Sequence, residues 1–163
     1  MSVDGFVSWL ADTPVSEGIG AHGWITPAVQ TVHILAIAVV MSAILMTNLR
    51  ALGAVGGGEP MARFSRHYAP RIGAALLVLL ISGATLIVGE PKRSLENPVF
   101  LLKMAMLIAA LALATAIHLP LRHDAEFWTP GARRIALRVM AGGSLAIWVA
   151  IIFAGRWIAY AVT

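Results

Sequence analysis

Four long apolar stretches, separated by short polar or charged segments, dominate the sequence. They cover about residues 27–50, 70–88, 98–119 and 130–162. The apolar centre of each has roughly 17–21 residues, enough to cross about 30 Å of hydrocarbon as an α-helix. The pattern therefore predicts an all-α fold, a four-transmembrane-helix bundle that makes a single integral membrane domain of residues 1–163.

The segment before the first stretch predicts a short amphipathic interfacial helix over about residues 3–12. Its apolar residues recur at helical spacing, as Val3, Phe6, Val7 and Leu10. A helix of this kind lies on the membrane surface. The segment carries Asp4 and Asp12 and no early Lys or Arg, so it does not resemble a signal peptide.

A proline stands near the start of each long stretch, in the pairs Thr26-Pro27, Ala69-Pro70, Asn97-Pro98 and Thr129-Pro130. Proline suits the first position of a helix because the N–H that it lacks has no intrahelical partner there. Thr and Asn are good N-caps. We therefore expect the four helices to begin at these prolines.

Small residues recur every three or four positions on the last two stretches, as Ala105, Ala109, Ala112, Ala116 and as Gly142, Ala146, Ala150, Ala154. Small side chains let helix backbones approach closely in lipid. We expect these stripes to be the packed faces of the bundle.

The amino-acid composition is also typical of an integral membrane protein. The chain is 59% hydrophobic and 12% charged, with a mean hydropathy of +0.83, whereas a soluble domain is about a quarter charged. The net charge of +4 comes from basic residues in short loops, so we interpret it as a topology signal and not as nucleic-acid binding. The chain has no cysteine, which excludes disulfides and thiolate metal sites.

The basic residues gather in the first and third loops and at the start of the fourth stretch: Arg50, Arg63, Arg66, Arg71, Arg122, Arg133, Arg134 and Arg138. The positive-inside rule puts these loops in the cytoplasm. Both termini are then extracytoplasmic.

One face of the first helix collects polar residues. Gln30, His33 and Asn48 share it, and polar groups in hydrocarbon usually face the bundle interior. A buried histidine can bind a cofactor or metal, or it can be a neutral group hydrogen-bonded to the next helix. Lys103 and Arg156 fall in the same outer half as His33. The three could bind a quinone headgroup or an anion, unless the two cations only extend to the interface.

The inner half offers two further histidines. His67 and His118 lie at similar depth on consecutive antiparallel helices, and imidazoles from facing helices can hold a haem iron. Neighbouring arginines could pair with the haem propionates. The leading hypothesis is therefore an electron-transfer protein that binds b-type haem within the membrane. His33 cannot share that iron, because it lies well over one helical turn from the depth of His118.

Other function classes stay open. One is a cofactor-free accessory or scaffold subunit that docks a partner membrane subunit. Another is a copper- or quinone-handling protein, since the seven Met and His33 offer ligands that suit copper. The apolar stretches contain no Asp or Glu, which argues against a proton-driven pump. No hydrolase, P-loop or dinucleotide motif is present, so enzymatic activity stays uncertain.

Two segments resemble a group of small four-helix bacterial membrane proteins known only as domains of unknown function. They are HILAIAVVMSAILMTNLRALG, from His33 to Gly53, and ENPVFLLKM, from Glu96 to Met104, with His118 further on. The resemblance implies a bacterial inner-membrane protein and directs interest to His33, Arg50, Lys103 and His118. That group often has an acidic residue before the Leu-Arg pair, where this chain has Asn48.

Overall fold

Four long helices form the body of the protein in the computed structural model, which describes residues 3–55, 60–129 and 131–158. They are α3 (Ile25–Leu52), α4 (Met61–Gly89), α6 (Pro98–His118) and α8 (Gly131–Trp157). Each is long and apolar enough to cross a membrane, with a mean hydropathy of 2.0 to 2.4 in its most apolar part. The predicted all-α, four-helix fold is confirmed, and the chain is a multi-pass membrane protein.

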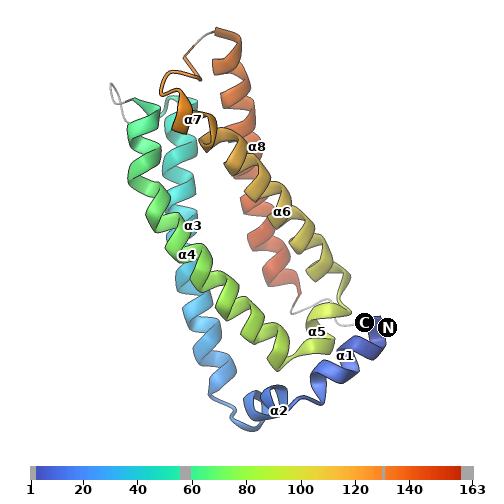
Figure 1. Ribbon diagram of the computed structural model, residues 1–163. Helices are drawn as coiled ribbons and strands as arrows, with labels where there is room; N and C mark the ends of the chain where they lie inside the picture. The colour runs from blue at the N-terminus through green and yellow to red at the C-terminus, as the bar shows by residue number, and fades with distance from the viewer. Residues whose placement is uncertain (1–2, 56–59, 130, 159–163) are drawn as a thin grey trace.

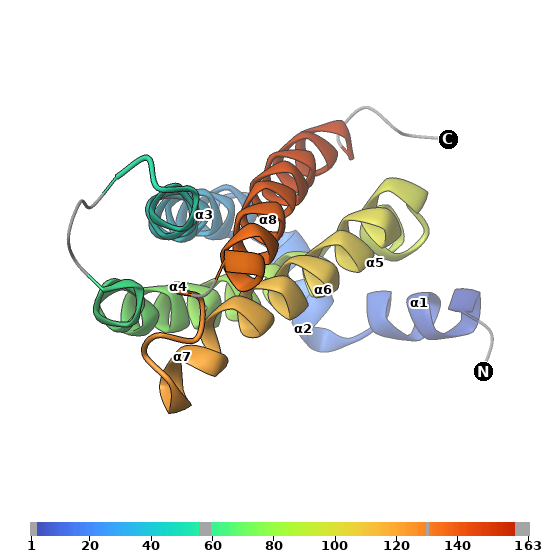
Figure 2. The ribbon, with the colours of Figure 1, turned by 90° about the horizontal axis from the view of Figure 1, so that it is seen from above.

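The long helices pack as two antiparallel pairs, α3 with α4 and α6 with α8 (Figure 1). α3 also packs against α8, which joins the two pairs along one seam. Figure 2 shows α8 between α3 and α6. On the other side of the bundle, α4 and α6 diverge towards the end that carries the short helix α5 (Pro91–Leu95) (Figure 1).

Short helices close both ends. α1 (Val3–Ala11), α2 (Pro14–Ala21) and α5 lie at one end, and α7 (Pro120–His123) lies at the other (Figure 1). These are called the α5 end and the α7 end below. The predicted N-terminal helix is present as α1, with Val7 fully buried and Phe6 and Trp9 exposed. Its place on a membrane surface stays a prediction.

Two clusters of buried side chains hold the bundle together. The central cluster draws on all four long helices: Val40, Ile44, Ala75, Ala110, Trp148 and Ile151. The second lies nearer the α7 end: Ala51, Ile117, Leu137 and Ala141. Trp148 is 4% exposed, and its indole N–H has no hydrogen-bond partner among the described residues, so packing alone holds that ring.

The prediction that the small-residue stripes are the packed faces is wrong for most of their members. On α6 the alanines of the stripe are exposed or half-exposed, whereas Ala110 is completely buried. On α8 Gly142 and Ala146 are exposed, and of that stripe only Ala154 is buried. The packed face of α8 carries the large ring of Trp148. The seam is therefore filled by side-chain volume and does not need small residues along its length.

The predicted start of the second long helix is also wrong. α4 begins at Met61, and Pro70 lies inside it. The residues from Met61 to Ala69 include several polar side chains, so they form a helical extension that hydropathy does not mark. Pro70 removes one backbone hydrogen bond, to the carbonyl of Arg66, and such an interruption is tolerated where other groups replace the bond.

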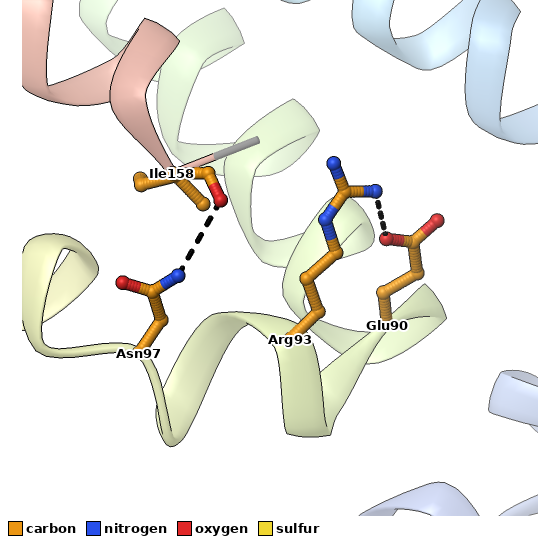
Figure 3. Close-up of polar contacts among 4 residues, drawn as sticks. All are labelled: Glu90, Arg93, Asn97 and Ile158. Atoms are coloured by element: carbon orange, nitrogen blue, oxygen red, sulfur yellow. Dashed lines mark hydrogen bonds and ion pairs between the residues drawn. The ribbon is translucent and has the colours of Figure 1, made fainter. Parts of the chain in front are cut away.

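The other helix starts agree better with the sequence. α6 begins at Pro98 as predicted, and the Asn97 side chain caps it by accepting from the Val99 N–H at 2.9 Å. The Asn97 amide also donates to the Ile158 carbonyl at 3.4 Å, which ties the start of α6 to the end of α8 (Figure 3). α3 begins at Ile25, just before Pro27. The predicted start at Pro130 lies outside the described residues.

Candidate functional site

His33 of α3 is half-buried in the half of the bundle towards the α5 end, and it faces α4. Its Nδ1 lies 2.8 Å from the Oγ of Ser82, which is 5% exposed. The bond joins two helices within their apolar spans. Water is scarce at this depth, so the two polar groups satisfy each other by hydrogen bonding.

The contacts of Ser82 assign the tautomer of His33. The Ser82 hydroxyl donates its single proton to the Val78 carbonyl at 2.6 Å, and its other contact, at 3.4 Å, is also a carbonyl. Ser82 can then only accept from His33, so the proton lies on Nδ1. The other ring nitrogen, Nε2, carries a lone pair and has no hydrogen-bond partner among the described residues. It can accept a proton or bind a metal ion.

The surroundings of His33 combine a glycine with a cation. A Cβ at Gly83 would stand 3.4 Å from the Cε1 of His33, so the ring packs against the bare backbone of α4. Lys103 of α6 reaches α8, where its Nζ lies 3.6 Å from the place of a Cβ on Gly155. The charge of Lys103 acts electrostatically on His33. All four long helices therefore contribute to this layer.

The polar residues that we expected near His33 differ in how far the structure buries them. His33 and Lys103 are half-buried, His33 against α4 and Lys103 against α8. Gln30 is exposed, so its predicted place inside the bundle is wrong. It lies about one turn nearer the α5 end than His33. Arg156 follows Gly155 in the chain, and its side chain is exposed.

Asn48 belongs to a second polar layer, towards the α7 end. Its amide donates to the Ser144 Oγ of α8 at 3.3 Å, and the two residues are 5% and 2% exposed. This contact lies on the α3–α8 seam that joins the helix pairs. Its prediction as an inward-facing residue is confirmed, and its role here is to link the two pairs.

His118 makes the same type of contact with the opposite polarity. Its Nδ1 lies 2.7 Å from the Oγ of Ser65 on α4. Ser65 is 7% exposed and has no other hydrogen-bond partner for its hydroxyl among the described residues. A buried hydroxyl that donates to nothing is costly, so Ser65 donates to Nδ1. The proton of His118 then lies on Nε2, which presents a donor and not a lone pair.

His67 lies on another side of α4. It is exposed, and its ring packs edge-on against Tyr68 with the centroids 5.2 Å apart. Ser65 and His67 are two positions apart, about 200° around the helix, so the residue that contacts His118 and the residue predicted to pair with it point in different directions. The structure does not bring His67 and His118 together. Their pairing on one iron stays a prediction that these contacts do not favour.

Within residues 3–55, 60–129 and 131–158, no group of three or more His, Asp or Glu side chains comes together. A bare metal ion needs several such ligands. Haem differs because the porphyrin supplies four of the ligands of its iron, so one imidazole is enough to hold it. Two described histidines, His22 and His33, have contacts that leave a lone pair on Nε2. His22 donates to the Gly18 carbonyl but is exposed and lies outside the long helices, whereas His33 lies within an apolar span.

Sequence reasoning missed the serines that position the imidazoles. Ser65, Ser82 and Ser144 each contact a polar side chain of another helix. Residue type could not have identified them, because hydroxyls elsewhere in the spans bond only to their own helix. Ser42, Thr85 and Thr115 each donate to the carbonyl four residues earlier.

Comparison with known proteins identifies a family. The model of a family of unknown function, DUF6644, matches residues 6–161. Neither a curated protein nor a solved structure matched the chain.

Proposed function

The chain belongs to the DUF6644 family, whose function is unknown, and from that premise we propose that it is a membrane redox protein that binds b-type haem through His33. The observation that carries the proposal is the anchored imidazole. A ligating histidine typically donates its other ring N–H to a fixed acceptor, which sets the tautomer and the direction of the ring. Ser82 is that acceptor here.

Lys103 favours haem over a bare copper ion. A metal cation held near an ammonium group is destabilised by repulsion between like charges. Haem instead carries two propionates, with which an ammonium group forms charge-assisted hydrogen bonds. The same residue that weakens a copper site would therefore strengthen a haem site.

When bound, haem supplies a one-electron redox couple. The chain's own part is to hold and shield it. His33 supplies one ligand, Ser82 orients that ligand, and the apolar spans of the four helices keep water away from the layer. The low polarity of this environment would help to set the redox potential of the haem. The chemistry is electron transfer within the bilayer, with a partner or a quinone as the other reactant.

The proposal includes an orientation. Arginines are concentrated at the α7 end, so the positive-inside rule places that end in the cytoplasm of a bacterium. His33 then lies in the half of the inner membrane that faces the periplasm, and both termini lie on that side.

A visible absorption spectrum tests the proposal. Protein purified from cells with ample haem should show a Soret band that shifts on reduction. The band should be lost in His33→Ala and retained in His118→Ala and His67→Ala, which are matched controls in the same bundle. Loss in both controls, with retention in His33→Ala, would instead support an iron held by His67 and His118. Colourless wild-type protein would contradict haem binding and favour the accessory-subunit alternative.

A further inference from the structure

A pocket of about 350 Å³ lies at the α7 end, away from His33. Its walls come from the end of α3, the start of α4, the segment before α8 and the first turns of α8. This is the level at which the apolar spans end, where lipid headgroups meet a membrane protein.

The pocket lining is basic. Arg50 of α3 and Arg134 of α8 contribute guanidinium groups, and among the described residues of the lining Glu126 is the one acidic residue. A third guanidinium lies close by, since Nη2 of Arg138 is 3.8 Å from the place of a Cβ on Gly53. Neither Arg134 nor Arg138 forms an ion pair with a carboxylate of the described residues. These two guanidinium groups therefore remain available to an anionic ligand.

Several other residues of the lining are apolar and held in place by packing. Leu137 is 5% exposed and belongs to the buried cluster, and Met61 packs against that cluster. The indole N–H of Trp128 donates to the Ile117 carbonyl at 2.9 Å, which holds the ring at the edge of the pocket. A ligand that suits these walls has an anionic group and an apolar part.

We propose that this pocket binds the phosphate group of an anionic phospholipid, with the lipid's glycerol and upper acyl chains against Leu137 and Met61. Guanidinium groups bind phosphate oxygens through paired N–H donors. Basic pockets between transmembrane helices are suited to anionic headgroups. The pocket lies apart from His33, so the proposal of a lipid site does not depend on the proposal of haem binding.

The variant Arg134→Gln tests the site, and Arg133→Gln is its matched control. The two residues are adjacent and equally charged, but the Arg133 guanidinium packs over the Phe127 ring, 4.5 Å from its centroid, and is not in the pocket lining. Native mass spectrometry of the full chain in detergent would count bound phosphatidylglycerol. Phosphatidylcholine and glycerol 3-phosphate would be the comparison ligands.

We expect phosphatidylglycerol to bind more tightly than phosphatidylcholine. Arg134→Gln should weaken its binding by about tenfold or more, since hydrogen bonds to charged groups are the strong ones. Arg133→Gln should leave it unchanged. Equal weakening by both substitutions would overturn the site, because diffuse surface charge would then explain the binding. If glycerol 3-phosphate binds as tightly as the lipid, the ligand is a soluble phosphate ester and the proposal of a phospholipid is wrong.

Discussion

Replacing Ser82 with alanine tests whether His33 is an oriented haem ligand or only a packed side chain. The substitution removes one oxygen and leaves the backbone of α4 intact. His33 loses the acceptor for its Nδ1–H, at 2.8 Å, and nothing else among the described side chains holds that proton. The ring is then free to turn, and the lone pair on Nε2 no longer has a fixed direction.

Two effects of different size follow. Losing one hydrogen bond between membrane helices costs roughly 0.6–2 kcal/mol of stability. Losing the group that orients a ligating histidine typically lowers metal affinity about 10- to 100-fold, which is roughly 1.4–2.7 kcal/mol of binding free energy. Ser82→Ala should therefore melt at a slightly lower temperature and bind haem at least tenfold more weakly.

Ser65→Ala is the matched control. It removes the same group from the same helix and breaks the corresponding contact with His118, at 2.7 Å. It should lower the melting temperature by a similar amount and leave haem affinity unchanged. The assay is titration of haem into the apoprotein, followed by absorbance, with thermal unfolding measured in parallel. Equal loss of haem affinity in the two variants would show that Ser82 does not act by orienting His33. Loss of affinity in Ser65→Ala alone would indicate that His118 is the haem ligand.

Three further predictions test the fold. Asn97→Ala should cost about 1 kcal/mol of stability, because it removes the α6 cap and the bond to the Ile158 carbonyl; thermal unfolding in detergent measures it. Ala110→Leu should destabilise the bundle by roughly 1–3 kcal/mol, because Ala110 is 0% exposed, whereas Ala109→Leu should be nearly neutral on its lipid-facing side; equal unfolding temperatures would mean that α6 packs through another face. Reporter fusions after Ala125 should report cytoplasm and fusions after Lys92 the opposite side; the reverse result would invert the proposed orientation.

Apolar length was sufficient to predict the number and approximate positions of the long helices. A span must satisfy its backbone internally and cover a fixed thickness, and few sequences other than a helix of this length can do so. The start of α4 could not be predicted in the same way. Hydropathy marks where a helix enters lipid and not where the helix begins, so the polar turns from Met61 to Ala69 were left out.

The candidate site was predictable only in part. Depth along the helices placed His33 and Lys103 at one level, and both are half-buried in the structure. The rotation of each helix about its axis decides the rest, and the pattern of small residues gave the wrong rotation for α6 and for most of α8. A spacing argument also could not show that Ser65 faces His118 while His67 turns away from it. That distinction depends on which side of α4 meets α6.

Haem binding through His33 requires an unprotonated Nε2, and ¹⁵N NMR of the apoprotein with ¹⁵N-labelled histidine measures this directly. Protonated and unprotonated ring nitrogens have well-separated shifts, and His33→Gln identifies the signals of His33 by their loss. At a pH where the imidazoles are neutral, we expect a proton on Nδ1 and a lone pair on Nε2 for His33, and the opposite tautomer for His118. A proton on Nε2 of His33, or two averaged signals from a freely exchanging ring, would contradict it.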